Sequence, residues 1–358
     1  MYKMVNGKNR IFYLDFIRAL AIILVVTAHI TRLFYRNAPH GSNYMHMVAP
    51  VMDWAIMGVP LFLMISGALL LNRKYGLGDF LKRRYKRILI PFLFWSVVTI
   101  VIRLLLDHQS ADPSNILHMF FDDYWYVWMI LGVYLFIPII NSFIRDYGIR
   151  GVEYFLVIWT FVMLLNTFGI YPLYHLELGN FAGYLGYIVL GYYLTNKDFK
   201  LSDLSMALLS LIIFLIVIMF LMHNTYSMSL LKHRLVYFDY QNIMTVIQSV
   251  ALFLFIRYFS LSSSKSPGSI KNKVYSFFKN SFMFKIIFTI STFSYGIYLA
   301  HYISLYSSKW IDKYYYPVYS HNPVIWLPIM IIAFLAVTIL ILWILNKIPG
   351  LRNVSGAH

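Results

Sequence analysis

Three ionisable side chains fall between positions 15 and 29, in the first long apolar segment of the chain: Asp15, Arg18 and His29. An ionisable residue in a membrane-spanning helix is costly, so three in one segment indicate a functional site. Arg18 and His29 are separated by about three helical turns, so they share a helix face about 16 Å apart along the axis. Asp15 precedes Arg18 by one turn, within pairing distance. The other interpretation is a salt bridge and a hydrogen-bonded histidine that serve packing alone.

A second group of residues is strongly basic and precedes an apolar run. Five cations occur in the six residues Lys82-Arg83-Arg84-Tyr85-Lys86-Arg87. If a helix begins here, Arg84 and Arg87 share one face of it. Arginine binds phosphate through paired, charge-assisted hydrogen bonds, so a phosphate-rich cytosolic ligand such as a coenzyme A ester would fit. The alternative is a basic flank that anchors a span against anionic lipid.

Three further motifs contain residues that could bind or react. Ser66 and Gly67 permit close helix approach in the second apolar segment, and a packing seam is the favoured interpretation. Trp125 lies in the aromatic run 124–128, which fits either an interfacial aromatic belt or stacking against a sugar. Tyr298 and His301 belong to the segment 294–301; such a histidine is more often structural than catalytic.

Several classes of functional site are excluded because the sequence lacks the residue types or motifs that they require. The chain has no cysteine, which excludes thiolate nucleophiles and cysteine-bound metals. It also has no His-Glu-x-x-His, no Gly-x-Ser-x-Gly and no phosphate-binding P-loop motif. We therefore expect neither a metal cofactor nor a serine hydrolase site.

Composition determines the class of protein. Sixty per cent of the 358 residues are hydrophobic and only 12% are charged. That balance predicts an all-α, polytopic membrane helix bundle that forms one domain over residues 1–358. We expect about ten spans, each long enough for the hydrocarbon layer. Their approximate bounds are 11–34, 47–71, 88–106, 124–144, 152–170, 181–195, 204–222, 241–259, 286–307 and 323–346.

The distribution of positive charge predicts the orientation. With these spans, 22 of the 30 Lys and Arg residues lie on one side of the membrane. The opposite side has seven: Arg32, Arg36, Arg103, Lys232, Arg234, Lys309 and Lys313. Because the richer side is normally cytoplasmic, both termini are expected in the cytoplasm. The net charge of +16 then reflects the residues that set membrane orientation and does not indicate nucleic-acid binding. Asp15 and Arg18 are placed nearer the cytoplasm and His29 nearer the outside.

These segments resemble the membrane acyltransferase-three family over about residues 10–346. Asp15 to Arg18 and then His29 are similar to its first-span signature, and 59–70 is similar to its second-span segment. Arg84 and Arg87 match its Arg-x-x-Arg motif. The segment around Trp125 and the segment 294–301 match its later motifs. One departure is visible, because Asp122 and Asp123 stand where the family has a histidine shortly before the tryptophan.

The resemblance implies an integral-membrane O-acyltransferase similar to single-domain enzymes that modify surface polysaccharides. The acyl group, most often acetyl, would come from cytoplasmic acyl-CoA. The acceptor would be a hydroxyl of a cell-surface glycan or of its lipid-linked precursor. Arg84, Arg87 and the adjoining Arg83 would bind the donor, with Arg18 deeper in its path. His29 would act as general base or as an acyl carrier, and Asp15 would hold Arg18.

A transporter or flippase that moves a glycan or lipid without chemistry is the alternative function. The arginine cluster favours the acyl-CoA enzyme, because an exporter does not need it. We expect a multi-pass protein of a prokaryotic plasma membrane, in contact with membrane lipid. The sequence leaves open the acceptor, the acyl group, an acyl-histidine intermediate and assembly into a homo-oligomer.

Overall fold

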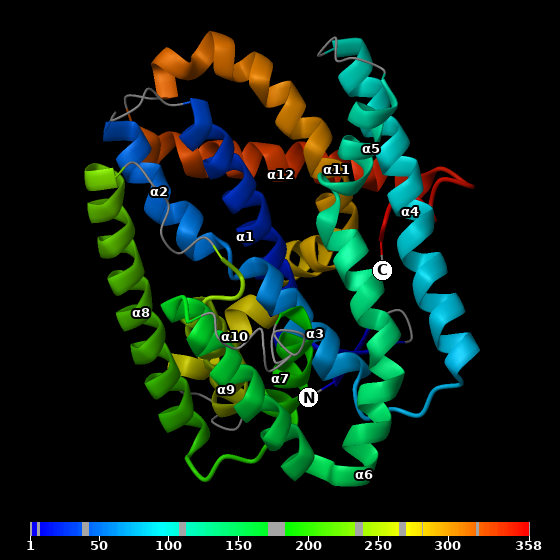
Figure 1. The fold of residues 1–358 in the computed structure, drawn as a ribbon, viewed down its shortest axis with the longest axis vertical. Helices are drawn as coiled ribbons and strands as arrows, with labels where there is room; N and C mark the ends of the chain where they lie inside the picture. Colours follow the sequence, from blue (N-terminus) through cyan, green and yellow to red (C-terminus); the bar gives the residue numbers. More distant parts are fainter. Residues whose placement is uncertain are drawn as a thin grey trace. The chain divides into compact units, whose positions relative to one another are not determined.

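The fold is almost entirely helical in the part of the chain that is described. The structure is a computed structural model, and it describes residues 2–5, 8–37, 43–106, 112–170, 183–232, 239–264, 270–280, 282–319 and 322–357. Figure 1 shows its helices in chain order. They are α1 Phe12–Asn37, α2 Asn43–Ala55, α3 Gly58–Leu70, α4 Leu77–Leu106, α5 Pro113–Phe121, α6 Trp125–Phe168, α7 Tyr184–Asn196, α8 Asp203–Lys232, α9 Ile243–Ser264, α10 Ile270–Asn280, α11 Phe282–Tyr319 and α12 Pro323–Lys347.

A short β-hairpin precedes α1, which the all-helical prediction did not include. Strand β1, Tyr2–Val5, pairs antiparallel with β2, Lys8–Ile11, and Tyr2 lies opposite Ile11. The sequence between the two strands reads Asn-Gly, which is the strongest short-range signal for a hairpin.

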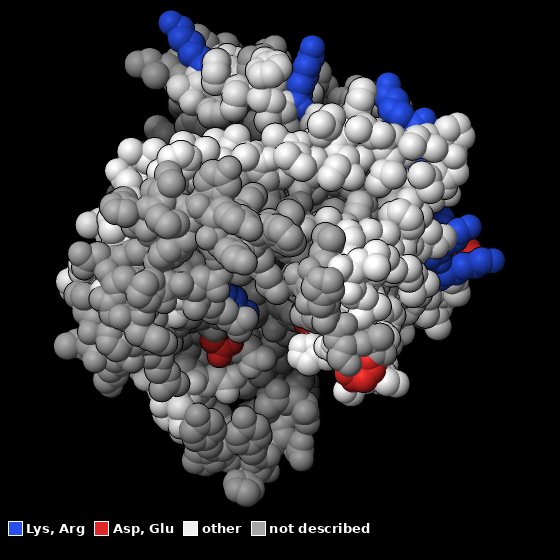
Figure 2. Space-filling view, turned by 90° about the horizontal axis from the view of Figure 1, so that it is seen from above, with Lys and Arg blue, Asp and Glu red and all other residues white. Residues whose placement is uncertain are grey.

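Eight helical stretches of the described chain are long and apolar enough to cross a membrane. The protein is therefore a multi-pass membrane helix bundle. Figure 2 shows one face, on which blue and red atoms form a few separate groups on a mostly white described surface. The eight stretches are Phe12–Arg32, His46–Leu70, Leu77–Leu105, Trp125–Phe168, Asp203–Met228, Ile243–Ser264, Phe282–Ile303 and Val324–Lys347.

The difference between these eight stretches and the ten predicted spans falls in two places. α6 is 44 residues long and has a non-helical kink at Gly148, with φ of 59°, between the predicted spans 124–144 and 152–170. α7 has 13 residues, which reach about 20 Å, less than the roughly 30 Å hydrocarbon layer. The count of ten stays a prediction. Arg234, Lys265 and residues 181 and 182 of the sixth predicted span lie outside the described residues.

Most helix bounds follow the apolar segments, and three differences from the prediction are informative. α4 begins at Leu77, well before the predicted span 88–106, so the basic cluster is part of a helix. α5, which was not predicted, begins after the N-cap residue Asp112, whose carboxylate accepts the Asn115 N–H at 2.9 Å. α10 is a second short helix that was not predicted.

The chain divides into two compact units. The first contains residues 1–72 and 143–291, and the second contains 73–142 and 292–358. In the first unit α1 packs on α2 and α3, while α8 packs on α9 and α2. α8 runs beside α2 on the left of Figure 1.

Two glycines form the closest helix contact of the first unit, between α3 and α7. A Cβ added to Gly67 would lie 1.8 Å from the carbonyl oxygen of Ile188. A Cβ added to Gly191 would lie 2.0 Å from the carbonyl oxygen of Met64. Since real Cβ atoms cannot approach so closely, both positions require glycine.

The second unit is tied together by tyrosine and tryptophan side chains that bond to distant backbone carbonyls. Tyr85 donates to Leu131 O at 2.8 Å, and Tyr295 donates to Ile88 O at 2.9 Å. Trp95 donates through Nε1 to Val354 O at 2.9 Å, which joins the segment after α12 to α4. Aromatic residues with a polar end suit this role, because they bury a large apolar area and still satisfy a carbonyl.

Candidate active site

Asp15 and Arg18 lie one turn apart near the start of α1, as predicted, but their ion pair is long. Arg18 Nη1 is 3.9 Å from Asp15 Oδ1. Ser291 lies closer to Asp15 than Arg18 does, and its Oγ donates to Asp15 Oδ1 at 2.8 Å. Asp15 is buried and Arg18 is half-buried. The carboxylate is thus held from two helices, α1 and the beginning of α11.

Ser291 is a residue that the sequence analysis missed. It is buried and lies three residues before the segment 294–301 that the motifs marked. A serine in an apolar segment usually bonds to its own helix, so its type alone gave no signal.

The hydrogen bonding of His29 fixes which ring nitrogen can take a proton. His29 Nδ1 lies 2.8 Å from the carbonyl oxygen of Val25, one turn back on α1. A carbonyl only accepts, so Nδ1 must carry the hydrogen. In the neutral ring the lone pair is then on Nε2. The orientation of His29 therefore leaves Nε2 as the basic atom, the arrangement that a general base needs.

The spacing of Arg18 and His29 along α1 follows from an unbroken helix. α1 runs from Phe12 to Asn37 without an internal proline. The side chains are therefore separated by about 16 Å along the axis, with Asp15 beside Arg18. The ionisable side chains of α1 are thus spread over about three turns of one straight helix.

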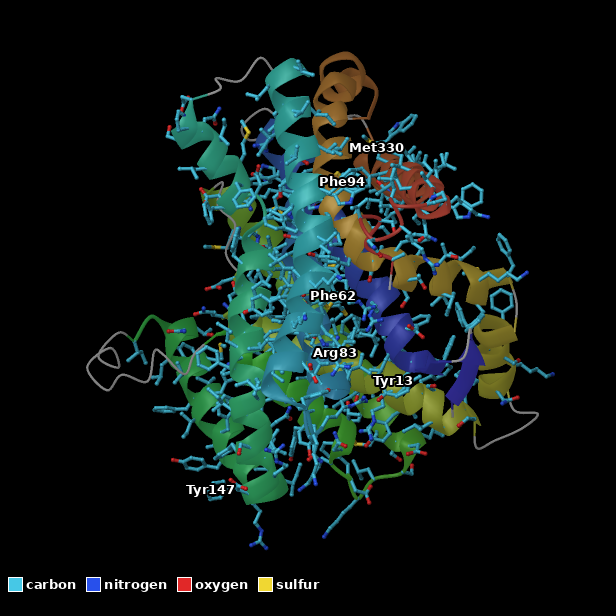
Figure 3. The ribbon with its side chains drawn as sticks, turned by 90° about the vertical axis from the view of Figure 1, so that its right-hand side faces the viewer. Tyr13, Phe62, Arg83, Phe94, Tyr147 and Met330 are labelled. Carbon is cyan, nitrogen blue, oxygen red and sulfur yellow. The ribbon has the colours of Figure 1, made fainter. Side chains whose placement is uncertain are left out.

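The arginine cluster lies on the first turns of α4, in the second unit. Arg83 and Arg87 are exposed, and Arg84 is half-buried. Arg83 donates through Nε to Asp79 O at 3.1 Å, and the Arg84 guanidinium lies 5.9 Å from the Phe80 ring centroid. Arg83 and Phe94 are labelled on this helix in Figure 3. Because the cluster is helical, Arg84 and Arg87 are neighbours on one face, as the sequence predicted.

The Ser66 hydroxyl is hydrogen-bonded within its own helix. Its Oγ donates to Phe62 O at 3.0 Å within α3. The adjacent Gly67 makes the α3–α7 contact described above. These contacts are those of a packing seam, and a functional role for Ser66 stays a prediction.

Tyr298 and His301 lie together on α11 in the second unit. The Tyr298 ring meets the Tyr126 ring edge to face, with centroids 5.2 Å apart, and its centroid lies 5.3 Å from that of the His301 ring. His301 is fully buried, and its Nδ1 faces the Tyr298 carbonyl oxygen. By the argument used for His29, its lone pair is on Nε2. Trp125 is half-buried and touches Tyr126, with centroids 6.1 Å apart.

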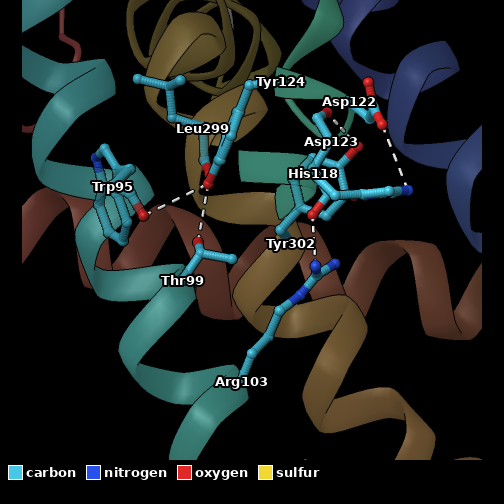
Figure 4. Close-up of polar contacts among 9 residues, drawn as sticks. All are labelled: Trp95, Thr99, Arg103, His118, Asp122, Asp123, Tyr124, Leu299 and Tyr302. Carbon is cyan, nitrogen blue, oxygen red and sulfur yellow. Dashed lines mark hydrogen bonds and ion pairs between the residues drawn. The ribbon is translucent and has the colours of Figure 1, made fainter. Parts of the chain in front are cut away.

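The two aspartates that depart from the resemblance have different surroundings (Figure 4). Asp122 is exposed and lies 3.3 Å from His118 Nε2. Asp123 Oδ2 lies 2.6 Å from Arg103 Nη1, and both side chains are largely buried. Burial raises the pKa of Asp123, and the Arg103 guanidinium offsets that rise only in part. Asp123 is thus a buried ion-pair residue, a role that the sequence did not indicate.

Tyr124 connects the loop before α6 to two other helices of the second unit. Its hydroxyl lies 2.8 Å from Thr99 Oγ1 and 3.2 Å from the Leu299 carbonyl oxygen. Tyr302 donates to the backbone carbonyl of Asp123. Figure 4 shows these bonds converging on the segment 122–124. The network fixes the start of α6, where Trp125 lies.

The candidate residues fall into two groups. Asp15, Arg18, His29 and Ser66 belong to the first unit, and the arginines, Trp125, Tyr298 and His301 belong to the second. Within the described residues there is no cluster of three or more His, Asp or Glu side chains that could hold a metal ion.

Comparison with known proteins identifies the class. Residues 11–344 match the acyltransferase domain family, so the chain belongs to that family. The family resemblance is thereby confirmed, and the chain is a multi-pass membrane protein of the acyltransferase domain family.

One relative is the nodulation protein NolL of Sinorhizobium fredii (strain NBRC 101917 / NGR234). The two chains are 29% identical over 150 residues, and the match spans 38% of this chain and 38% of NolL. No solved structure matches the chain.

Proposed function

We propose that the protein is an O-acyltransferase that moves an acyl group from acyl-CoA to a hydroxyl of a cell-surface glycan or its lipid-linked precursor. Acetyl is the acyl group that we propose first. The observation that carries the proposal is the His29 Nδ1 contact with Val25 O, which leaves Nε2 as the base. Membership of the acyltransferase domain family supports the reaction class.

The chemistry assigned to His29 is general base and then general acid catalysis. Nε2 takes the proton of the acceptor hydroxyl as its oxygen attacks the thioester carbonyl. The carbon–sulfur bond then breaks, and the coenzyme A sulfur receives the proton from Nε2. An acyl-histidine intermediate is the alternative: Nε2 attacks the thioester carbonyl and expels the coenzyme A thiolate, and the acceptor hydroxyl then attacks the acyl-imidazole, which releases His29 while the hydroxyl proton passes to the thiolate. Imidazole suits both routes, because its ordinary pKa is near neutrality.

We assign the phosphates of acyl-CoA to Arg84 and Arg87, with Arg83 beside them. Their planar guanidinium groups suit phosphate, and they lie exposed or half-buried at the beginning of a helix. Arg18 is assigned to the donor path on α1. Asp15, held by Ser291 at 2.8 Å, would position Arg18 through their electrostatic interaction.

We further propose ten spans with both termini in the cytoplasm of a prokaryotic cell, in its plasma membrane. The charge asymmetry and the kink at Gly148 support this topology. A single acyltransferase domain over residues 1–358 is proposed because the family match runs through both compact units.

The experiment that tests the proposed function supplies labelled acetyl-CoA to the purified protein in lipid discs, with and without extracted surface glycan. We expect label to move to the glycan. Without acceptor, slow thioester hydrolysis is expected. A folded protein that binds no acetyl-CoA and transfers no label in either arm would contradict the proposal.

A further inference from the structure

The short helix α10 lies between two long apolar helices of the first unit. Only residues 265–269 separate it from α9, and only residue 281 separates it from α11. The stretches Ile243–Ser264 and Phe282–Ile303 on its two sides are both long and apolar enough to cross a membrane. With 11 residues, α10 itself reaches about 17 Å and is too short to cross. A helix that joins the ends of two consecutive spans must lie close to the surface of the hydrocarbon layer.

One face of α10 packs against the beginning of α1. Tyr275 is buried, and its ring meets the Phe12 ring edge to face, with centroids 5.5 Å apart. The Phe278 and Phe16 rings also meet edge to face, with centroids 5.9 Å apart. Phe12 is the first residue of the apolar stretch that could cross the membrane as α1. The contact therefore places α10 where a third span begins, within the same compact unit.

The other face of α10 is exposed and combines apolar side chains with a cation. Val274 is 42% exposed and Phe277 is 57% exposed. Lys273 is exposed as well. At 3.6 residues per turn, these three positions fall within an arc of about 100°, and Tyr275 lies outside it. Apolar side chains on one face with lysine at its edge are typical of a helix that lies in the membrane interface.

The segment that contains α10 is positively charged without compensating acids. α10 contains Lys271, Lys273 and Lys279, and residues 240–311 include no Asp or Glu. Lys285, on the first turns of α11, is exposed. Lysines near a membrane surface are attracted to the phosphates of anionic lipids. The exposed apolar side chains favour a lipid surface over a soluble acidic partner, because they can be buried at the level of the acyl chains.

We infer that α10 binds anionic phospholipid at the membrane surface through Lys273, Val274 and Phe277. The two apolar side chains enter the boundary between headgroups and acyl chains, and the lysine donates hydrogen bonds to lipid phosphate. The inference goes beyond the proposed acyl transfer and does not depend on it. Because α10 packs on the first turns of α1, the bound lipid lies at the end of α1 near which Asp15 and Arg18 occur.

The test measures lipid contact at one position of α10. A bimane fluorophore is attached to Val274→Cys, and the absence of any other cysteine makes the label specific. The full chain is placed in lipid discs that hold one copy each, and nitroxide-labelled phosphatidylglycerol or phosphatidylcholine is the quencher. We expect both lipids to quench the fluorophore and the anionic lipid to quench it several-fold more strongly. This preference should fall as the salt concentration is raised.

The variants separate the lysines of α10 from positive charge elsewhere. Lys273→Gln should lower the preference for phosphatidylglycerol by up to about fivefold, the factor for one lysine at an anionic surface. Replacing Lys271, Lys273 and Lys279 together by Gln should remove most of the preference. The matched control is Lys200→Gln, because Lys200 is an exposed lysine of the same unit that lies outside α10. It should quench as the parent does.

Four outcomes would overturn the inference. The first is no quenching by either lipid, which would place Val274 in water or in protein. The second is equal quenching by the two lipids in the parent protein, and the third is an unchanged preference in the triple lysine variant. The fourth is loss of quenching in discs that hold two copies, which would identify a second copy of the chain as the partner of this face.

Discussion

Asp15 is held more closely by Ser291 than by the arginine one turn away. The hydroxyl is 2.8 Å from the carboxylate, whereas Arg18 Nη1 is 3.9 Å from it. Arg18 is half-buried, and its side chain lies one turn from this carboxylate. His29 is oriented differently, by its own helix backbone. The same segment thus combines a carboxylate held by a second helix with an imidazole oriented by its own helix.

The donor assignment predicts a change in affinity at the arginines. Arg84→Ala and Arg87→Ala should each weaken acetyl-CoA binding by about 1–3 kcal/mol, the range of a charge-assisted hydrogen bond. Arg87→Lys should recover only part of the loss, because lysine lacks the planar fork. Equilibrium binding of labelled acetyl-CoA measures this.

The matched control for the arginine variants is Lys74→Ala, since Lys74 is an exposed cation shortly before the same helix. It should bind donor as the parent does. If all three alanine variants lose the same small amount, general charge explains the result and the phosphate assignment fails.

At the scale of single elements, the close contact between α3 and α7 leaves no space for a side chain larger than glycine at Gly67. A Cβ at Gly67 would meet backbone, not a flexible side chain, at 1.8 Å. We therefore expect Gly67→Ala to destabilise the protein by about 1–3 kcal/mol or more, as overpacking does. Thermal unfolding in detergent, followed by tryptophan fluorescence, provides the measurement.

Gly132→Ala is the control for this contact, because a Cβ at Gly132 meets nothing within 4 Å. It should unfold at the temperature of the parent or slightly above. Equal stability of the two alanine variants would show that α3 and α7 do not approach as closely as described.

The buried Arg103–Asp123 pair gives the second unit a pH-dependent stability. Burial raises the pKa of Asp123, and Arg103 opposes that rise. An acid whose folded-state pKa lies above its unfolded value favours the folded state below the unfolded pKa, and this advantage is lost as pH rises through the folded pKa. Removing Arg103 raises the pKa further and leaves a buried, uncompensated carboxylate at neutral pH.

Arg103→Met should therefore lose about 3–5 kcal/mol of stability near pH 8, as expected for breaking a buried pair. The loss should shrink as pH falls toward 5, because Asp123 becomes protonated. The double variant Arg103→Met with Asp123→Asn should show no such recovery. Urea unfolding across this pH range is the measurement, and a pH-independent deficit in the single variant would refute the account.

For the whole molecule, the proposed orientation rests on the distribution of positive charge and can be tested by labelling. The chain has no cysteine, so single cysteines can be introduced freely. Ser114 on α5 and Ser202, directly before α8, are both exposed and are predicted on opposite sides. In intact cells an impermeant thiol reagent should label Ser114→Cys and not Ser202→Cys. The reverse pattern, or equal labelling, would contradict the proposed topology.

Much of the helical architecture could be predicted because long apolar segments permit few other structures in a membrane. The segment 11–34 is α1 almost to its ends. The kink at Gly148 and the shortness of α7 could not be predicted from hydropathy, since both depend on backbone conformation and on tertiary neighbours. The Asn-Gly dipeptide is a local signal for the β-hairpin, but a prediction from composition does not use it.

The candidate site was predictable where the residues share a helix and not where they meet in space. The spacing of Asp15, Arg18 and His29 is a property of one helix. Ser291 lies 276 positions from Asp15 in the chain, so no local pattern could predict their hydrogen bond. Contacts of this kind depend on packing, which one sequence does not encode as a local pattern.

Acyl transfer by His29 variants tests the central claim most directly. Transfer of labelled acetyl from acetyl-CoA to extracted glycan is measured for His29→Asn and His29→Ala, beside the yield of folded protein and donor binding. Asparagine can keep a hydrogen bond to Val25 O but has no lone pair that takes a proton near neutral pH. We predict that both variants fold and bind acetyl-CoA yet lose transfer by at least about a hundredfold, the lower range for general base catalysis. Substantial transfer by a well-folded His29→Asn protein would contradict the account and direct attention to His301.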